Sequence, residues 1–233
     1  MNKYIILPTY NEAENLEKII KAIFDQNIAD LNIIVVDDNS PDKTGHIADA
    51  LSSDYPISVI HRKEKLGLGT AYIEGFSEAI KKGAEIVFEM DSDFSHDPAD
   101  LPRLVKEIEK GFDFAIGSRR VPGGNVRGWD FRRNLQSKLA MAFARFALGL
   151  KTKDITAGFR CIRASILEEI NFKTIKSNGY AFQEELIYRV EKAGYKISEV
   201  PVTFVDRKFG KSKLGVGDIV EFFITVLKLR FSR

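Results

Sequence analysis

The amino-acid sequence predicts an α/β protein in which a mostly parallel central sheet is flanked by helices. Three observations support this fold class. Short apolar runs alternate with segments whose apolar residues recur at helical spacing, and the joins between them are short. The runs are nearly uninterrupted, as in strands buried on both faces. A polar cluster follows each run, and ligands of such sheets bind beyond the carboxyl ends of the strands.

The first half of the chain alternates strand and helix. Apolar runs predict strands at residues 3–7, 31–36, 57–60 and 86–90. Apolar residues at helical spacing predict helices around residues 16–23, 47–51, 71–80 and 101–108. This order indicates consecutive strand–helix units that build a parallel sheet.

The second half continues with longer segments. We expect strands at residues 112–117, from Asp154 to about 162, and at 196–204. Helices are expected at residues 129–148, 180–193 and about 217–231. The chain is therefore divided into a main domain of residues 1–214 and a C-terminal amphipathic helix within residues 215–233.

Composition excludes several classes of protein. The chain has 35 basic and 33 acidic residues, and its net charge of +2 gives no general basic field of the kind that binds nucleic acid. The single Cys161 excludes an intrachain disulfide and fits a reducing compartment. No apolar run reaches the ~20 residues needed to cross a bilayer. We expect a cytoplasmic protein that is soluble or attached peripherally to a membrane.

The most informative polar cluster contains Asp91 and Asp93, directly after the strand at residues 86–90. Two carboxylates aimed at one point repel each other unless a cation lies between them. Mg²⁺ commonly takes one or two protein carboxylates and completes its shell with water and substrate phosphates. The cluster is thus a candidate metal–diphosphate site, although a lone Asp-x-Asp also fits a turn cap beside a solvated carboxylate.

Other strand ends carry groups that suit a nucleoside diphosphate. Tyr10 offers a flat face for a base, Glu12 an acceptor for ribose hydroxyls, and Asp37 an acceptor for the base edge. Arginine and lysine side chains suit phosphate oxygens, and the candidates are Arg119, Arg133, Arg207 and Lys213. Each of these residues alone also has an ordinary structural explanation.

Two common alternatives find little support. The glycines of Gly67-Leu68-Gly69 begin a predicted helix, but the third glycine of a dinucleotide fingerprint is absent. No nucleophile elbow of a Ser-His-Asp hydrolase is present.

Several motifs in one order carry a family resemblance. They are Pro8-Thr9-Tyr10-Asn11-Glu12, Val35 to Asp42, Gly67 to Ala71, Met90 to Asp93 with His96-Asp97-Pro98, Gly117-Ser118-Arg119, Thr156 to Arg160, and Asp206-Arg207 with Gly210, Ser212, Lys213 and Leu214. Together they resemble an inverting glycosyltransferase family with the GT-A fold, the dolichol-phosphate (polyprenol-phosphate) mannose synthases. The resemblance covers nearly the whole chain.

The resemblance implies transfer of mannose from GDP-mannose to the phosphate of a polyprenyl (dolichyl) phosphate, giving a β-linked product. It implies nucleoside contacts from Pro8, Tyr10, Glu12, Val35 and Asp37. It implies that Asp91 and Asp93 hold Mg²⁺ or Mn²⁺ on the donor diphosphate, that Arg119 and Arg133 bind the acceptor phosphate, and that Arg207 and Lys213 bind the donor diphosphate. Ser95 stands where related sequences often have Gln, so the resemblance does not carry over a direct metal contact at this position, where a hydroxyl bonded through water could stand in.

Alternatives stay open on the basis of sequence. A polyprenyl-phosphate glucosyltransferase that uses UDP-glucose would share the fold, and a non-catalytic nucleotide-sugar or lipid-phosphate binding module is the alternative from another class. The C-terminal helix has a wide apolar face and ends in Lys228, Arg230 and Arg233, which suits a membrane interface. Docking on the core or on a membrane partner subunit fits the same pattern.

Overall fold

The computed structural model describes residues 1–177, 179–206 and 216–231. Within these residues, seven strands form one sheet in the order β3-β2-β1-β4-β7-β5-β8. The strands are β1 (Lys3–Thr9), β2 (Leu31–Asp37), β3 (Ile57–His61), β4 (Ile86–Glu89), β5 (Phe114–Ser118), β7 (Arg160–Arg163) and β8 (Ile197–Pro201). Strand β7 runs antiparallel to both of its neighbours, and the other pairings are parallel. The expected mostly parallel sheet is confirmed.

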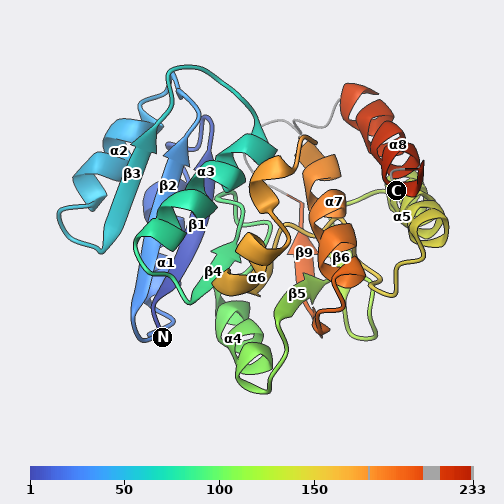
Figure 1. Cartoon of the computed structure of the whole chain (residues 1–233). Helices are drawn as coiled ribbons and strands as arrows, with labels where there is room; N and C mark the ends of the chain where they lie inside the picture. The colour runs from blue at the N-terminus through green and yellow to red at the C-terminus, as the bar shows by residue number, and fades with distance from the viewer. Residues whose placement is uncertain (178, 207–215, 232–233) are drawn as a thin grey trace.

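Helices cover both faces of this sheet (Figure 1). They are α1 (Leu16–Phe24), α2 (Thr44–Leu51), α3 (Leu68–Lys81), α4 (Leu101–Glu109), α5 (Phe131–Leu148), α6 (Ala164–Glu169), α7 (Gly179–Lys192) and α8 (Val216–Phe231), with short 3₁₀ turns η1 (Pro98–Asp100) and η2 (Phe172–Thr174). One core cluster joins the sheet to α3, α5, α6, α7 and α8, and a second joins it to α1, α2 and α4. The sheet is therefore the middle of three layers.

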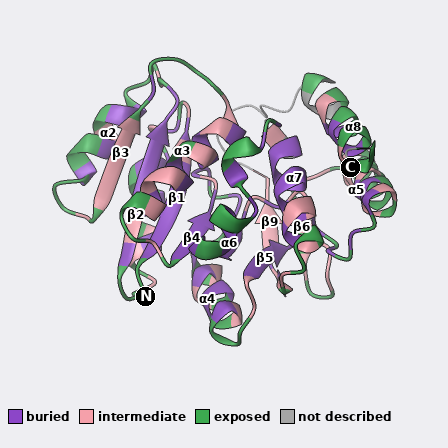
Figure 2. Cartoon of the chain, in the orientation of Figure 1, coloured by how far each residue is buried: buried purple, intermediate pink, exposed green. Residues whose placement is uncertain are grey.

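The central strands are apolar because both of their faces are buried. In β1, Ile5 and Leu7 contribute to one core cluster and Ile6 to the other, and all three are completely buried. Figure 2 shows this burial along β1, β2 and β4. Alternate residues of a strand point to opposite faces, so a strand with a helical layer on each side must be apolar throughout.

Two predicted strands differ from those observed. The single strand expected at residues 196–204 is divided at Val202 into β8 and β9 (Thr203–Val205), and β9 leaves the main sheet to pair with β6 (Asn125–Arg127). The strand expected from Asp154 begins only at Arg160, and residues 154–159 form a loop at the carboxyl edge of the sheet. The apolar Ile155, Ala157 and Phe159 are buried in that loop, which is why the segment resembles a strand.

The C-terminal helix α8 packs against α5 and α7. Phe222 and Val226 are buried in the core cluster that these helices share, and the Tyr188 hydroxyl on α7 donates a hydrogen bond to the Leu229 carbonyl at 3.2 Å. The opposite side of α8 is exposed, and Phe143 of α5 contacts Phe223 with ring centroids 5.5 Å apart. Only part of the apolar face of α8 packs on the core, so this face is wider than packing on the core requires.

Candidate active site

Most of the expected site residues that the structure describes lie at or beside one edge of the sheet, because the parallel strands end there. Strands β1, β2, β4 and β5 end at Thr9, Asp37, Glu89 and Ser118. The antiparallel strand β7 starts at this same edge with Arg160, which pairs with Glu89 and Ile116. The loops after β1, β2, β4 and β5 and the loop before β7 therefore meet here, as expected for an α/β sheet.

The loops after β1 and β2 are joined at Asp37. Its carboxylate accepts hydrogen bonds from the Thr9 hydroxyl at 3.0 Å and from the Ser40 backbone and hydroxyl at 3.0 and 2.5 Å. The next residue, Asp38, donates its backbone N–H to the Thr9 carbonyl at 2.9 Å. Asp37 is only 4% exposed, so it shapes this loop as well as lying at the predicted nucleoside position.

The other predicted nucleoside residues occupy different depths. Tyr10 is half-buried, and the Lys65 ammonium lies 4.0 Å from its ring centroid. The Glu12 carboxylate is buried and accepts a hydrogen bond from the Asn15 amide at 3.0 Å, while the Pro8 carbonyl accepts one from Ser92 at 3.3 Å. Val35 is completely buried in the core, so its side chain supports the edge from below.

A buried ion pair fixes the loop that presents Lys65. Asp38 accepts hydrogen bonds from Arg62 and from the Leu66 and Gly67 backbone N–H groups, all at 2.9 Å. Asp38 and Arg62 are both less than a tenth exposed. Because these contacts bracket Lys65 in the chain, they hold its backbone next to Tyr10.

Asp91 and Asp93 lie in the loop that follows β4. Asp91 is half-buried and Asp93 is 8% exposed. The Asp93 carboxylate accepts the Ser95 backbone N–H at 2.9 Å, and the Ser95 carbonyl accepts the N–H of Val205 from β9 at 3.0 Å. The carboxylates are thus carried by a turn that is attached to a second structural element.

Gly158 leaves space beside Asp91. A Cβ atom at this glycine would lie 3.7 Å from Asp91 Oδ2 and 3.7 Å from the Gln183 side-chain nitrogen. Both distances are ordinary van der Waals contacts, so the absence of a side chain there keeps the region next to the Asp91 carboxylate open. The sequence motif that contains Gly158 suggested the family but not this role.

A buried polar cluster supports the Asp91 loop from below. Glu89 and Arg160 are completely buried, and Arg160 Nε lies 3.6 Å from a Glu89 carboxylate oxygen. The Arg160 guanidinium donates hydrogen bonds to the Ile155 and Gln183 carbonyls at 3.1 and 2.9 Å. Burial raises the pKa of Glu89 to about 7, opposed by the Arg160 charge. This cluster connects β4, the loop before β7 and helix α7.

Arg119, one of the predicted acceptor residues, is clamped by Asp154. Its Nε and Nη2 atoms donate to the two Asp154 oxygens at 2.8 and 2.6 Å, and its backbone N–H donates to Asp154 Oδ2 at 2.7 Å. Burial raises the pKa of Asp154, but the charge and hydrogen bonds of Arg119 outweigh it, and the net pKa is below its ordinary value. The clamp fixes the orientation of the guanidinium.

Arg133, the second predicted acceptor residue, lies at the start of α5. Its guanidinium is 4.3 Å from the ring centroid of Trp129 and donates to Asp206 at 2.9 Å. Arg119 approaches the same Trp129 ring at 5.9 Å, so the structure brings the two arginines to one aromatic side chain. Arg207 and Lys213 lie outside the described residues, and their donor-diphosphate contacts stay a prediction.

His96 connects the aspartate loop to the arginine region. Its ring stacks on Phe159 at 4.9 Å and meets Phe204 edge-on at 5.3 Å, and Arg119 lies 5.3 Å from the Phe204 centroid. Burial, reinforced by the nearby Arg119 charge, lowers the pKa of His96 to about 4. The ring is therefore neutral at physiological pH and packs as an aromatic group.

The donor set fits a hard divalent cation that shares its shell with a substrate. The two carboxylates of Asp91 and Asp93 would be the protein's oxygen ligands to such a cation, and no group of three or more His, Cys, Asp or Glu among the described residues is placed to hold a metal. Mg²⁺ in phosphate-binding sites typically takes one or two carboxylates and completes its shell with phosphates and water. The arrangement suits a metal that binds together with a diphosphate.

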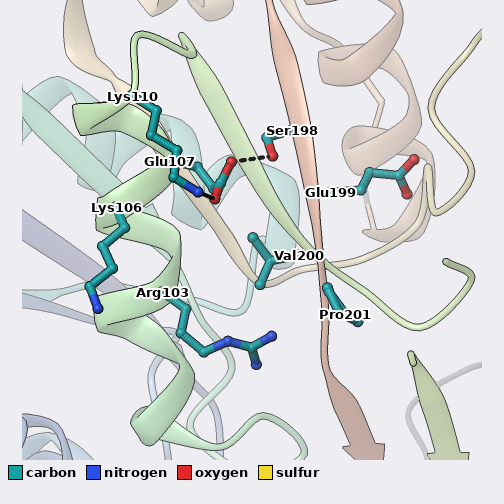
Figure 3. Close-up of a pocket in the computed structure, with 8 residues that line it drawn as sticks. All are labelled: Arg103, Lys106, Glu107, Lys110, Ser198, Glu199, Val200 and Pro201. Carbon is teal, nitrogen blue, oxygen red and sulfur yellow. Dashed lines mark hydrogen bonds and ion pairs between the residues drawn. The ribbon is translucent and has the colours of Figure 1, made fainter. Parts of the chain in front are cut away.

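A separate groove of about 320 Å³ lies between α4 and β8 (Figure 3). Glu107 in this groove accepts hydrogen bonds from Ser198 at 2.7 Å and Lys110 at 2.6 Å. Its described lining contains none of the predicted site residues. We therefore place the candidate active site at the carboxyl edge of the sheet.

Comparison with known proteins defines the class. The model of glycosyl transferase family 2 matches residues 4–171, and this chain belongs to that family. It is 44% identical over 224 residues to the polyprenol monophosphomannose synthase of Mycolicibacterium smegmatis, covering 95% of this chain and 84% of the relative. It is 42% identical over 229 residues to the undecaprenyl-phosphate mannosyltransferase of Micrococcus luteus, covering 98% and 93%.

Solved structures confirm the GT-A fold. Glucosyl-3-phosphoglycerate synthase from Mycobacterium tuberculosis, in complex with Mn²⁺, UDP-glucose and phosphoglyceric acid, superposes with a TM-score of 0.72 at 21% identity, covering 98% of this chain and 79% of that one. The same enzyme with Mn²⁺, UDP and phosphoglyceric acid gives 0.73 at 20% identity, covering 100% and 79%. At this identity the likeness concerns the fold alone.

Proposed function

We propose that this glycosyltransferase moves mannose from GDP-mannose to the phosphate of a polyprenyl phosphate with inversion at the sugar carbon. The observation that carries the proposal is the 42–44% identity, over nearly the whole chain, to two proteins named for mannosyl transfer to polyprenyl lipids. The geometry of the site agrees with it. The carboxylates of the loop after β4 and Arg119 after β5 follow strands that end at the same edge of the sheet, and Arg133 shares the Trp129 ring with Arg119.

The donor is proposed to bind over the loops after β1, β2 and β4. Tyr10 would stack on the base, with Glu12 and Asp37 as acceptors for donors on the ribose and base. Asp91 and Asp93 would hold Mg²⁺ or Mn²⁺, with Ser95 reaching the metal through water. The cation would neutralise the charge that develops on the leaving diphosphate.

The acceptor is proposed to bind at Arg119 and Arg133. Its nucleophile is a phosphate monoester, which is already anionic at neutral pH, so the reaction needs no dedicated general base. The neutral, buried His96 agrees with this. The protein contributes by holding two anions close together and aligning the phosphate oxygen with the sugar carbon. Arg119 is suited to this because Asp154 fixes its guanidinium.

Contact with a membrane is proposed to occur through an exposed apolar surface on α5 and α8, here called the α5–α8 surface. Ten of the thirteen large apolar side chains exposed in the described part of the chain lie on it: Phe131, Leu135, Leu139, Phe143, Phe146, Val220, Phe223, Ile224, Leu227 and Phe231. The two helices lie side by side at one end of the molecule (Figure 1). An apolar patch of this kind marks an interaction site.

The positive charge of α5 and α8 favours an anionic lipid membrane as the partner of the α5–α8 surface. The exposed basic residues of the two helices are Arg132, Lys138, Lys228 and Arg230. Basic side chains next to an apolar helical face suit anionic head groups, each contributing about 1 kcal/mol near the surface. Among the described residues, no helix is long and apolar enough to span a membrane. We propose peripheral attachment at the cytoplasmic face, which brings the start of α5, with Arg133, close to the lipid-borne phosphate.

Flotation with vesicles tests the attachment. Vesicles that contain anionic lipid should carry the wild-type protein upward, and Leu139→Ser or Phe146→Ser should reduce the floated fraction. Leu66→Ser is the control, because Leu66 is 49% exposed and its backbone N–H is bonded to Asp38 after β2, near the β3 edge of the sheet. Equal flotation of all variants would contradict the proposed surface, and a requirement for another protein would favour a membrane partner subunit.

Label transfer tests the reaction itself. The protein is incubated with a polyprenyl phosphate and either radiolabelled GDP-mannose or radiolabelled UDP-glucose, and the lipid phase is counted. We expect mannose to enter the lipid. Entry of glucose instead would support the polyprenyl-phosphate glucosyltransferase. Binding of either nucleotide sugar without transfer would support a non-catalytic binding module.

A further inference from the structure

Arg133 is held by a carboxylate although it lies where an acceptor phosphate is proposed to bind. Its Nη1 atom donates to Asp206 Oδ2 at 2.9 Å, and the two side chains are 37% and 30% exposed. The guanidinium also stacks on Trp129, and the Arg133 backbone N–H is capped by Asp130 at 2.7 Å. The guanidinium is thus oriented by the Trp129 ring and the Asp206 carboxylate, and the second of these contacts is an anion.

The backbone delivers the Asp206 carboxylate to this position. The Asp206 N–H donates to the Arg127 carbonyl at 2.9 Å, which extends the pairing of β6 with β9. Gly128 has a φ of +92°, and a Cβ atom there would lie 2.8 Å from the Asp206 Cβ. A residue with a side chain at position 128 would therefore push Asp206 away from Arg133.

We propose that Asp206 is an internal competitor that occupies Arg133 in place of the acceptor phosphate and is displaced when the acceptor binds. This inference rests on the proposed function. Carboxylate and phosphate oxygens bind a guanidinium in the same way. A phosphate monoester carries a charge of about −1.5 to −2 at pH 7, so it and an ionised Asp206 repel each other at one arginine.

The competition has a consequence for turnover. Transfer forms a bond between the acceptor phosphate oxygen and the sugar carbon and breaks the bond from that carbon to the diphosphate. The acceptor dianion becomes a monoanionic phosphodiester, and the leaving diphosphate takes the other negative charge, so no proton moves. A competitor at Arg133 lowers the affinity for the lipid-phosphate acceptor and for the phosphodiester product by the same factor. The monoanionic product, which binds a guanidinium less strongly, is then the ligand that Asp206 displaces more readily.

The test measures lipid-phosphate binding directly. Trp129 is the only tryptophan of the chain and contacts Arg133, so its fluorescence reports ligands at this arginine. Farnesyl phosphate, a short polyprenyl phosphate, is titrated into wild type, Asp206→Asn and Asp113→Asn. The control is matched, because Asp113 pairs with Arg163 at 3.8 Å with side-chain exposures of 27% and 36%.

We expect Asp206→Asn to lower the Kd for farnesyl phosphate about two- to fivefold, the range set by a partly exposed ion pair. The control should leave the Kd unchanged, and Arg133→Met should abolish the effect of Asp206→Asn. A raised Kd in Asp206→Asn would overturn the proposal, because it would make Asp206 a residue that positions Arg133. An unchanged Kd would overturn it as well. If wild type binds no farnesyl phosphate, the acceptor assignment fails together with the competitor.

Discussion

The ion pair between Arg119 and Asp154 allows a quantitative prediction. Asp154→Asn removes the negative charge but keeps one oxygen acceptor. In the wild type the Asp154 side chain is completely buried and that of Arg119 is 5% exposed. The variant therefore leaves a buried guanidinium beside a neutral amide.

The expected cost follows from this burial. Removing one partner of a buried ion pair typically costs about 3–5 kcal/mol, and we expect the lower end, about 3 kcal/mol, because asparagine keeps an acceptor. For a chain of this size, 1 kcal/mol corresponds to about 2–4 °C in Tm. The Tm of Asp154→Asn should therefore fall by about 6–12 °C. The KM for the polyprenyl phosphate should also rise, because Arg119 loses its fixed orientation.

The pH dependence gives a second readout of the same pair. The pKa of Asp154 in the folded protein lies below its ordinary value because Arg119 outweighs the effect of burial. A carboxyl with a depressed pKa stabilises the folded state above the pKa of the unfolded chain, about 3.9, and loses that contribution as the pH falls through the folded pKa. The difference in unfolding free energy between wild type and variant should be complete at pH 7 and shrink below about pH 4.

Urea unfolding at pH 7 and at pH 3 measures the loss of unfolding free energy and its pH dependence. Asp113→Asn is the control in a partly exposed ion pair and should lose less than about 1 kcal/mol. A loss below about 1 kcal/mol in Asp154→Asn at pH 7, together with an unchanged KM, would refute the reasoning.

Three further predictions concern the surroundings of the site. Burial raises the pKa of Glu89 to about 7. The contribution of Glu89 to the unfolding free energy therefore falls as the pH rises from about 4.5 to 7. Over that range, the unfolding free energy of Glu89→Gln should rise relative to that of wild type by up to about 3 kcal/mol. The same pH dependence of the unfolding free energy in wild type and Glu89→Gln would disprove the raised pKa of Glu89. Gly158→Ala should fold with wild-type Tm, because its Cβ meets Asp91 only at 3.7 Å, but should reduce sugar transfer; full activity would show that the space beside Asp91 is not used. Transfer by His46→Ala and His61→Ala should stay within about twofold of wild type, since no histidine base is required, and a hundredfold loss in either would point to a base after all.

The sequence predicted the strands whose burial is complete. Ile5, Ile6 and Leu7 show an apolar run without alternation, which only a covered sheet explains. The direction of β7 could not be predicted in the same way, because an apolar run carries no information on whether its neighbours are parallel. Strand β6 was missed, since Asn125–Arg127 is short and its side chains are largely exposed.

Positions at the carboxyl edge of the sheet could be predicted where one strand end places them, as with Asp91 and Asp93 after β4. Their partners could not, because they come from distant parts of the chain. Asp154 lies 35 residues after Arg119, and Asp206 lies 73 residues after Arg133. Only the folded chain shows that Arg119 and Arg133, the two arginines predicted to bind the acceptor phosphate, are each paired with a carboxylate. This pairing changes the expectation from two open cations to two arginines that each already contact a carboxylate.

Metal-dependent nucleotide binding tests the central claim most directly. GDP is titrated calorimetrically into wild type, Asp91→Asn and the exposed control Asp54→Asn, with Mn²⁺ or Mg²⁺ and again with EDTA. The account predicts that EDTA or Asp91→Asn weakens GDP binding at least about tenfold, a loss of about 1.4 kcal/mol, whereas Asp54→Asn binds as wild type does. Equal affinity with and without metal, retained in Asp91→Asn, would contradict it.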